Sequence, residues 1–137
     1  MFRYVRIQDG SPLPDITDLE PFKAIVVIED RVAGEWQKAV STWLVRSGCL
    51  FMMAWGDDCS SWDDSVDYAN LEEFDFGEIP EDQVVMTTWH DSQTLPEVFE
   101  FAKVHARHPL VTLSNVLVVH LGTEDRHAEF CAFLDPA

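Results

Sequence analysis

The 137-residue sequence predicts one α/β domain in which helices cover both faces of a mainly parallel sheet. Short β-branched apolar runs, typical of strands buried on both faces, alternate with segments whose apolar residues recur at helical spacing. Hydrophobic residues make up 47% of the chain and aromatic residues 12%, enough for a packed interior. We therefore expect residues 1–137 to form a three-layer sandwich, Rossmann-like or flavodoxin-like, around a four-stranded sheet with crossover helices.

The first predicted strand and helix lie in the first third of the chain. Residues 24–28, Ala-Ile-Val-Val-Ile, form a continuous apolar run that ends at Glu29 and Asp30. A helix is expected over residues 33–47, because its apolar residues share one face and Gly48 supplies a stop. Ahead of this pair, residues 2–7 can add an edge strand.

Three more strands are expected at residues 49–55, 84–89 and 115–121. The helix between the last two begins at Thr94-Leu-Pro-Glu97, which has the spacing of a capping box, and ends before Pro109. A shorter helix can begin at Ser61. From Thr123 onward the pattern fits a final helix, and a final strand is the alternative.

Acidic residues outnumber basic ones by 25 to 9, so the formal net charge is −16. Fourteen of the carboxylates lie in residues 47–102, a segment without Lys or Arg. A negative field of this size repels nucleic-acid phosphates and anionic membranes and attracts basic surfaces. The charge therefore favours a basic protein partner, and a solvated acidic loop that only maintains solubility is the alternative.

Polar side chains follow every predicted strand, where open parallel sheets bind their ligands. Carboxylate and imidazole groups at such a rim can perform acid/base chemistry or bind a divalent metal. The candidate catalytic residues are Asp57, Asp58, His90 and Asp91, with Glu29 or His120 in support. The candidate metal ligands are Asp57, Asp58, His90 and His120. The alternative is that the carboxylates cap helix N-termini and the histidines only complete local hydrogen bonds.

Known cofactor and catalytic motifs are missing from the sequence. The six glycines are too widely spaced for a dinucleotide-binding fingerprint or a phosphate-binding P-loop. Cys49, Cys59 and Cys131 lack the C-x-x-C spacing of zinc and redox sites, and we expect reduced thiols, two of them in the core. Aspartates surround Cys59, and negative charge raises a thiol pKa, which argues against a catalytic cysteine. No cofactor is expected beyond a divalent metal.

The acidic middle of the chain also carries aromatic residues near predicted strand ends, a composition suited to a protein interface. The candidate partner-binding residues are Trp62, Asp63, Asp64, Asp67, Glu72, Glu73 and Trp89. Neither a membrane-spanning run nor a secretory signal is recognised in the sequence, so we expect a cytoplasmic protein.

Three segments, residues 43–56 (WLVRSGCLFMMAWG), 62–66 (WDDSV) and 87–91 (TTWHD), are similar to those of a small bacterial family of unknown function. The resemblance extends over nearly the whole chain and implies no activity. It implies that the three segments belong together, which suits a site built from the second and third predicted strands.

Together these observations favour a non-enzymatic protein-binding module, in an immunity or defence setting such as neutralisation of a basic nuclease-like toxin. A nucleic-acid mimic is a related possibility. The alternative is a metal-dependent hydrolase or another small-molecule enzyme with its site at the carboxyl ends of the strands.

Overall fold

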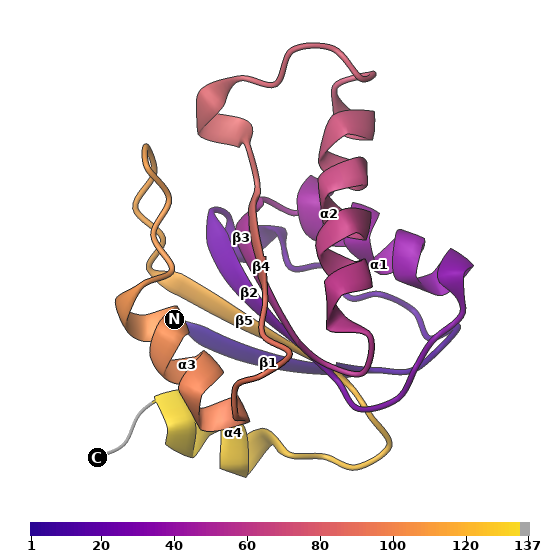
Figure 1. Ribbon diagram of the computed structural model, residues 1–137, viewed down its shortest axis with the longest axis vertical. Helices are drawn as coiled ribbons and strands as arrows, with labels where there is room; N and C mark the ends of the chain where they lie inside the picture. Colours follow the sequence, from indigo (N-terminus) through magenta and orange to yellow (C-terminus); the bar gives the residue numbers. More distant parts are fainter. Residues whose placement is uncertain (135–137) are drawn as a thin grey trace.

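The computed structural model describes residues 1–134, which contain one five-stranded sheet with every neighbouring pair parallel (Figure 1). The strands are β1 (Phe2–Ile7), β2 (Phe22–Ile28), β3 (Cys49–Gly56), β4 (Met86–Trp89) and β5 (Asn115–Leu121), in the spatial order β1-β5-β2-β3-β4. The helices are α1 (Gly34–Arg46), α2 (Cys59–Glu73), α3 (Leu95–Val104) and α4 (His127–Leu134). Short 3₁₀ turns occupy Thr17–Leu19 and Glu81–Gln83.

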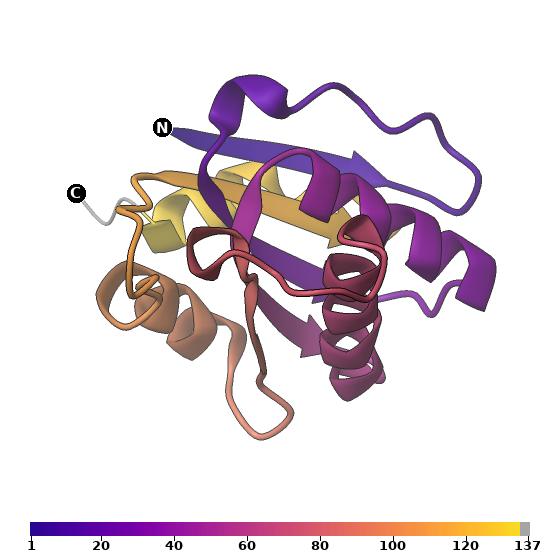
Figure 2. The ribbon, with the colours of Figure 1, turned by 90° about the horizontal axis from the view of Figure 1, so that it is seen from above.

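The predicted α/β class and the four predicted strands are confirmed, but the sheet has five strands rather than four. The additional strand is β1, which pairs with β5 from Phe2 opposite Val116 to Ile7 opposite Leu121. It lies at one edge of the sheet, seen in indigo in Figure 2. The C-terminal segment is a helix, because Phe130 and its neighbours pack on the sheet at helical spacing.

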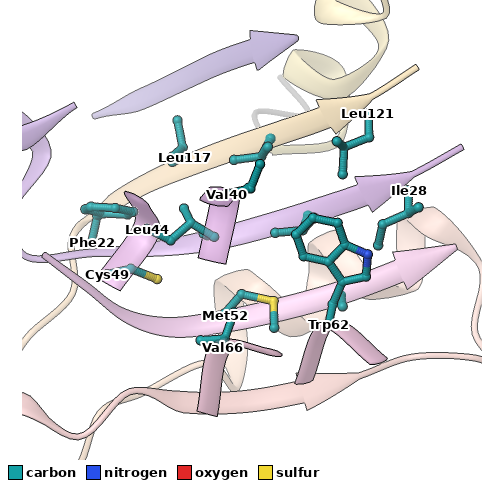
Figure 3. Packing of buried hydrophobic residues seen from close by; sticks show 14 of the residues in the cluster. Phe22, Ile28, Val40, Leu44, Cys49, Met52, Trp62, Val66, Leu117 and Leu121 are labelled. Carbon is teal, nitrogen blue, oxygen red and sulfur yellow. The ribbon is translucent and has the colours of Figure 1, made fainter. Parts of the chain in front are cut away.

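Helices α1 and α2 cover one face of the sheet, and α3 and α4 cover the other (Figure 1). On the first face, Leu44 of α1, Trp62 of α2 and Met52 of β3 belong to one buried cluster (Figure 3). On the second face, Phe99 of α3 and Phe130 of α4 pack in the cluster that includes alternate residues of β2. Since successive side chains of a strand point to opposite faces, the fully buried β2 supplies both clusters.

The helix ends follow their local sequence. Thr94 caps α3 in a complete capping box, in which its hydroxyl accepts from the Glu97 N–H and the Glu97 side chain bonds the Thr94 N–H. Gly56 ends β3 with a φ of 114°, and a Cβ there would lie 2.1 Å from the carbonyl oxygen of Ile28. Only glycine fits this close approach, which carries the chain into α2.

The chain leaves β2 toward α1 on one face and leaves β5 toward α4 on the other, although the two strands are neighbours. In open α/β sheets, ligands bind in the crevice at the carboxyl ends of two strands that diverge in this way. The crevice between β2 and β5 is therefore the first place to examine for a site. No helix within residues 1–134 has both the length and the apolar character to cross a membrane.

Candidate functional site

The carboxyl ends of β2 and β5 are joined by a hydrogen-bonded network of four side chains. His120, at the end of β5, is fully buried between Tyr4 of β1 and Glu29, which follows β2. The Tyr4 hydroxyl lies 2.7 Å from His120 Nδ1, and His120 Nε2 contacts the Glu29 carboxylate. Arg126, just before α4, donates to Glu29 at 3.0 Å and through its backbone N–H to the Tyr4 oxygen at 3.1 Å.

The hydrogen-bond partners in this network favour one tautomer of the His120 imidazole. A carboxylate only accepts hydrogen bonds, so Nε2 of His120 donates to Glu29. The Tyr4 oxygen accepts from the Arg126 N–H and has its own proton to donate, which makes Nδ1 the acceptor. The tautomer with the proton on Nε2 satisfies every group, and burial raises the pKa of the Tyr4 hydroxyl.

Side chains close this crevice. The Phe130 ring packs edge-on against His120, with 5.3 Å between the two ring centroids. A Cβ at Gly122 would lie 2.6 Å from His120 Nε2. The network therefore joins α4 to the sheet and occupies the carboxyl ends of β2 and β5.

The carboxyl ends of β2 and β3 hold a second polar group. Arg31 donates to both oxygens of Asp57 at 3.1 Å, and both side chains are largely exposed. Asp58 occupies the left-handed region at φ 53° as the residue before α2. A cavity of about 210 Å³ lies between these residues and the first turns of α1 and α2. Asp57 thus faces an arginine rather than another acid or a histidine.

His90, which follows the third predicted strand, lies in the interior. His90 is 6% exposed. Its Nε2 is hydrogen-bonded to Thr88 Oγ1 at 2.9 Å, and its Nδ1 is hydrogen-bonded to Gln93 Oε1. The ring packs edge-on against Phe101 of α3, with 4.8 Å between the ring centroids. Within residues 1–134, no three His, Cys, Asp or Glu side chains form a group suited to hold a metal ion. The predicted ligands Asp57, Asp58, His90 and His120 are therefore not assembled into one cluster.

A different group of residues lies where α2 packs along β4. We define the α2–β4 face as Asp63, Asp64 and Asp67 of α2 with Thr87 and Trp89 of β4. Thr87 Oγ1 donates to Asp67 at 2.8 Å, and Asn70 on the same side of α2 accepts the Val85 N–H at 2.9 Å. Burial, with the charges of Asp63 and Asp64, raises the pKa of the Asp67 carboxyl, and the Thr87 bond opposes this.

Asp63 lies one turn before Asp67 and is 8% exposed, and its Oδ1 has no hydrogen-bond partner. Trp89 lies two residues beyond Thr87 on β4 and is 49% exposed. One helical turn and two strand residues span similar lengths, about 5.4 and 6.6 Å, which places Trp89 at the level of Asp63. The face thus combines unneutralised carboxylates with an exposed indole.

The sequence matches a protein family described as a domain of unknown function, DUF7684, over residues 2–137. The chain belongs to the DUF7684 family. Neither a search of curated proteins nor a search of solved structures found a match. The expected membership of a family of unknown function is confirmed, and the three segments that suggested it meet in this DUF7684 chain around β3, α2 and β4.

The predicted partner-binding residues divide into three groups. Trp62 was expected at a surface, but it is 2% exposed and packs in the core because it lies on the sheet-facing side of α2 (Figure 3). Glu72 and Glu73 face α1, where they pair with Lys38 at 3.6 Å and Arg46 at 2.9 Å. The remaining residues, Asp63, Asp64, Asp67 and Trp89, belong to the α2–β4 face.

Sequence reasoning identified Glu29 and His120 as supporting residues but missed Tyr4, Arg31 and Arg126. Tyr4 and His120 are 116 positions apart and meet only through the β1–β5 pairing. The cysteines follow expectation: all three are free thiols, and Cys49 and Cys59 are buried. Burial raises the pKa of the Cys49 thiol to about 12.

Proposed function

We propose that this DUF7684 domain binds a basic segment of a partner protein through its α2–β4 face. The observation that carries the proposal is Asp63, whose carboxylate is largely buried and leaves Oδ1 without a hydrogen bond. An unsatisfied buried polar atom costs about 1–3 kcal/mol, more when charged. Oδ1 itself is inaccessible to solvent, so an ammonium or guanidinium group that a partner places beside Asp63 would supply the missing counter-charge rather than a bond to that atom.

The charge around Asp63 supports a cationic partner. Helix α2 contains five carboxylates and no Lys or Arg, and only Glu72 and Glu73 pair with α1. Asp63, Asp64 and Asp67 form no ion pair with the rest of residues 1–134. A basic segment would therefore be attracted by both the local carboxylates and the net charge of −16.

The exposed indole of the face supports a protein rather than an inorganic cation as ligand. Trp89 is 49% exposed, and interfaces are enriched in Trp. A basic protein such as a nuclease-like toxin, neutralised by a cytoplasmic immunity or defence protein, has the required chemistry. A nucleic-acid mimic would present its charge similarly but has no need of the exposed indole.

An enzymatic role receives less support from the geometry. The candidate residues Asp57, Asp58, His90 and Asp91 include a buried, fully bonded histidine and a carboxylate paired with Arg31. We also infer a Rossmann-like relationship, because β4-β3-β2-β5 repeats the 3-2-1-4 order of that fold. In this chain, the corresponding ligand crevice is filled by the network around His120.

The test is binding of a defined basic peptide, a fluorescent ten-residue peptide of alternating Lys and Val, measured by anisotropy at low and high NaCl. We expect Asp63→Asn with Asp67→Asn to weaken binding about tenfold at low salt, equivalent to about 1.4 kcal/mol, and to flatten the salt dependence.

The matched control is Asp30→Asn with Glu124→Gln, which removes the same charge from two exposed positions outside the face. Equal weakening by both double variants would mean that only net charge attracts the peptide, and the α2–β4 face would lose its assigned role.

A further inference from the structure

We infer that the partner segment binds as an added β-strand on the open edge of β4, with basic side chains at alternate positions directed toward α2. This inference rests on the proposed function and specifies its binding mode and the class of peptide it accepts. Strand addition supplies affinity through backbone hydrogen bonds and specificity through alternate side chains.

The backbone of β4 supplies the first argument. β4 is the last strand of the sheet and pairs with β3 alone. The His90 N–H donates to the Ala54 carbonyl, and in a parallel ladder alternate residues turn both backbone groups toward the same neighbour. Met86, Thr88 and His90 therefore bond β3, and Thr87 and Trp89 direct their N–H and C=O groups to the open edge.

The side chains of β4 supply the second argument. Natural edge strands are commonly protected by Lys, Pro, inward-pointing charges or a covering segment. The sequence Met-Thr-Thr-Trp contains no charge and no proline, and β-branched and aromatic residues favour strands. Its length of four residues is its one protective feature, and it limits the added strand to a short segment.

The position of α2 supplies the third argument. Asp67 bonds Thr87, which shows that this side of α2 overhangs β4. A new strand would lie about 4.8 Å beyond β4, and every second side chain would point to the α2 side of the sheet. Those side chains would meet Asp63, Asp64 and Asp67, so a period-two pattern of Lys or Arg matches the carboxylates.

The same charges argue against pairing of β4 with a second copy of this chain. Antiparallel β4–β4 pairing would bring two sets of the three aspartates together, and like charges across an interface oppose association. A basic extended segment from another protein is therefore the occupant.

The experiment compares three peptides of identical charge: the alternating Lys-Val peptide, the same peptide N-methylated at alternate residues, and a version with the lysines grouped at one end. N-methylation removes the donors that pair with an edge while leaving charge intact. We expect the alternating peptide to bind about tenfold more tightly than either of the others. We also expect amide exchange at Thr87 and Trp89 to slow in its complex, measured by NMR on the full chain.

A matched pair of protein variants tests the same contact. Trp89→Ala and Trp89→Pro both remove the indole, but only proline also removes the edge N–H. We expect weaker binding for Trp89→Pro than for Trp89→Ala, with circular dichroism and amide exchange of β3 used to verify that both variants fold. If Trp89→Pro perturbs β3, the variant Thr87→Ala and the comparison of the three peptides replace it as the test of strand addition.

The outcomes separate the two proposals. Equal affinity for all three peptides, abolished by Asp63→Asn with Asp67→Asn, would overturn strand addition and leave the acidic face as a docking site. Absence of binding by every peptide would overturn the proposed function and this inference with it. Slowed exchange at β1 instead of β4 would assign the added strand to the opposite edge and overturn the inference.

Discussion

Asp63 and Asp67 lie one turn apart on the same side of α2, but their carboxylates differ in hydrogen bonding. Asp67 accepts from Thr87, whereas Oδ1 of Asp63 accepts from no group. The pKa of Asp67 is raised, because burial and the charges of Asp63 and Asp64 oppose the ionised form of its carboxyl. Residues held in this state are typical of binding sites rather than of surfaces optimised for stability.

The first prediction concerns the pH dependence of Asp67→Asn. The pKa of Asp67 is raised in the folded state, so its ionisation destabilises the fold as pH rises above the ordinary aspartate range. The asparagine oxygen can still accept from Thr87. We expect the variant to be more stable than the wild type at pH 7, with the difference shrinking toward pH 4, in urea denaturation across this range.

The exposed Asp30→Asn is the control, since it removes the same charge from a position outside the α2–β4 face. A stability difference for Asp67→Asn that is independent of pH would contradict the assignment of the effect to ionisation.

The second prediction separates a structural from a catalytic role for His90. Both ring nitrogens are bonded and the ring packs on Phe101, so His90→Ala leaves a cavity and orphans Thr88 and Gln93. We expect a loss of about 2–4 kcal/mol in the free energy of unfolding, measured by urea titration. A variant with unchanged stability would restore His90 as a functional candidate.

At the scale of elements, the sequence predicted best where a single pattern decided the structure. The buried runs of β2 and β5 and the capping box of α3 were identified because local composition alone specifies them. β1 was only one option for its segment, because its partner β5 is distant in sequence. Trp62 was misplaced because the boundary of α2 was uncertain: the helix begins two residues earlier than expected, at Cys59, and Trp62 faces the sheet.

The third prediction concerns the attachment of α4. Tyr4→Phe removes the hydroxyl that bridges His120 Nδ1 and the Arg126 N–H while keeping the ring stacked on His127. Both former partners lose a bond near a buried site, and we expect a loss of about 1–3 kcal/mol in unfolding free energy. Amide exchange should accelerate in α4 more than in α2, and equal acceleration in both helices would indicate global destabilisation instead.

At the scale of the whole molecule, two electrostatic effects oppose each other. Exposed ion pairs such as Arg3 with Asp18 stabilise the fold only weakly, and salt weakens them further. The excess of 16 negative charges repels itself, and salt weakens that repulsion too. The excess is concentrated in residues 47–102, where only a few carboxylates have cationic neighbours, so repulsion is the larger effect.

The last prediction is therefore that NaCl stabilises the free protein. We expect Tm to rise between about 20 and 300 mM NaCl, a range in which the screening length falls from about 20 to 6 Å. Asp63→Asn with Asp67→Asn should have a higher Tm at low salt and a smaller rise, because two of the repelling charges are gone. Chloride is the appropriate salt, since sulfate stabilises proteins by exclusion from their surface. A Tm that falls with NaCl would mean that the ion pairs dominate, and the concentrated negative charge could then not be the force that recruits a basic partner.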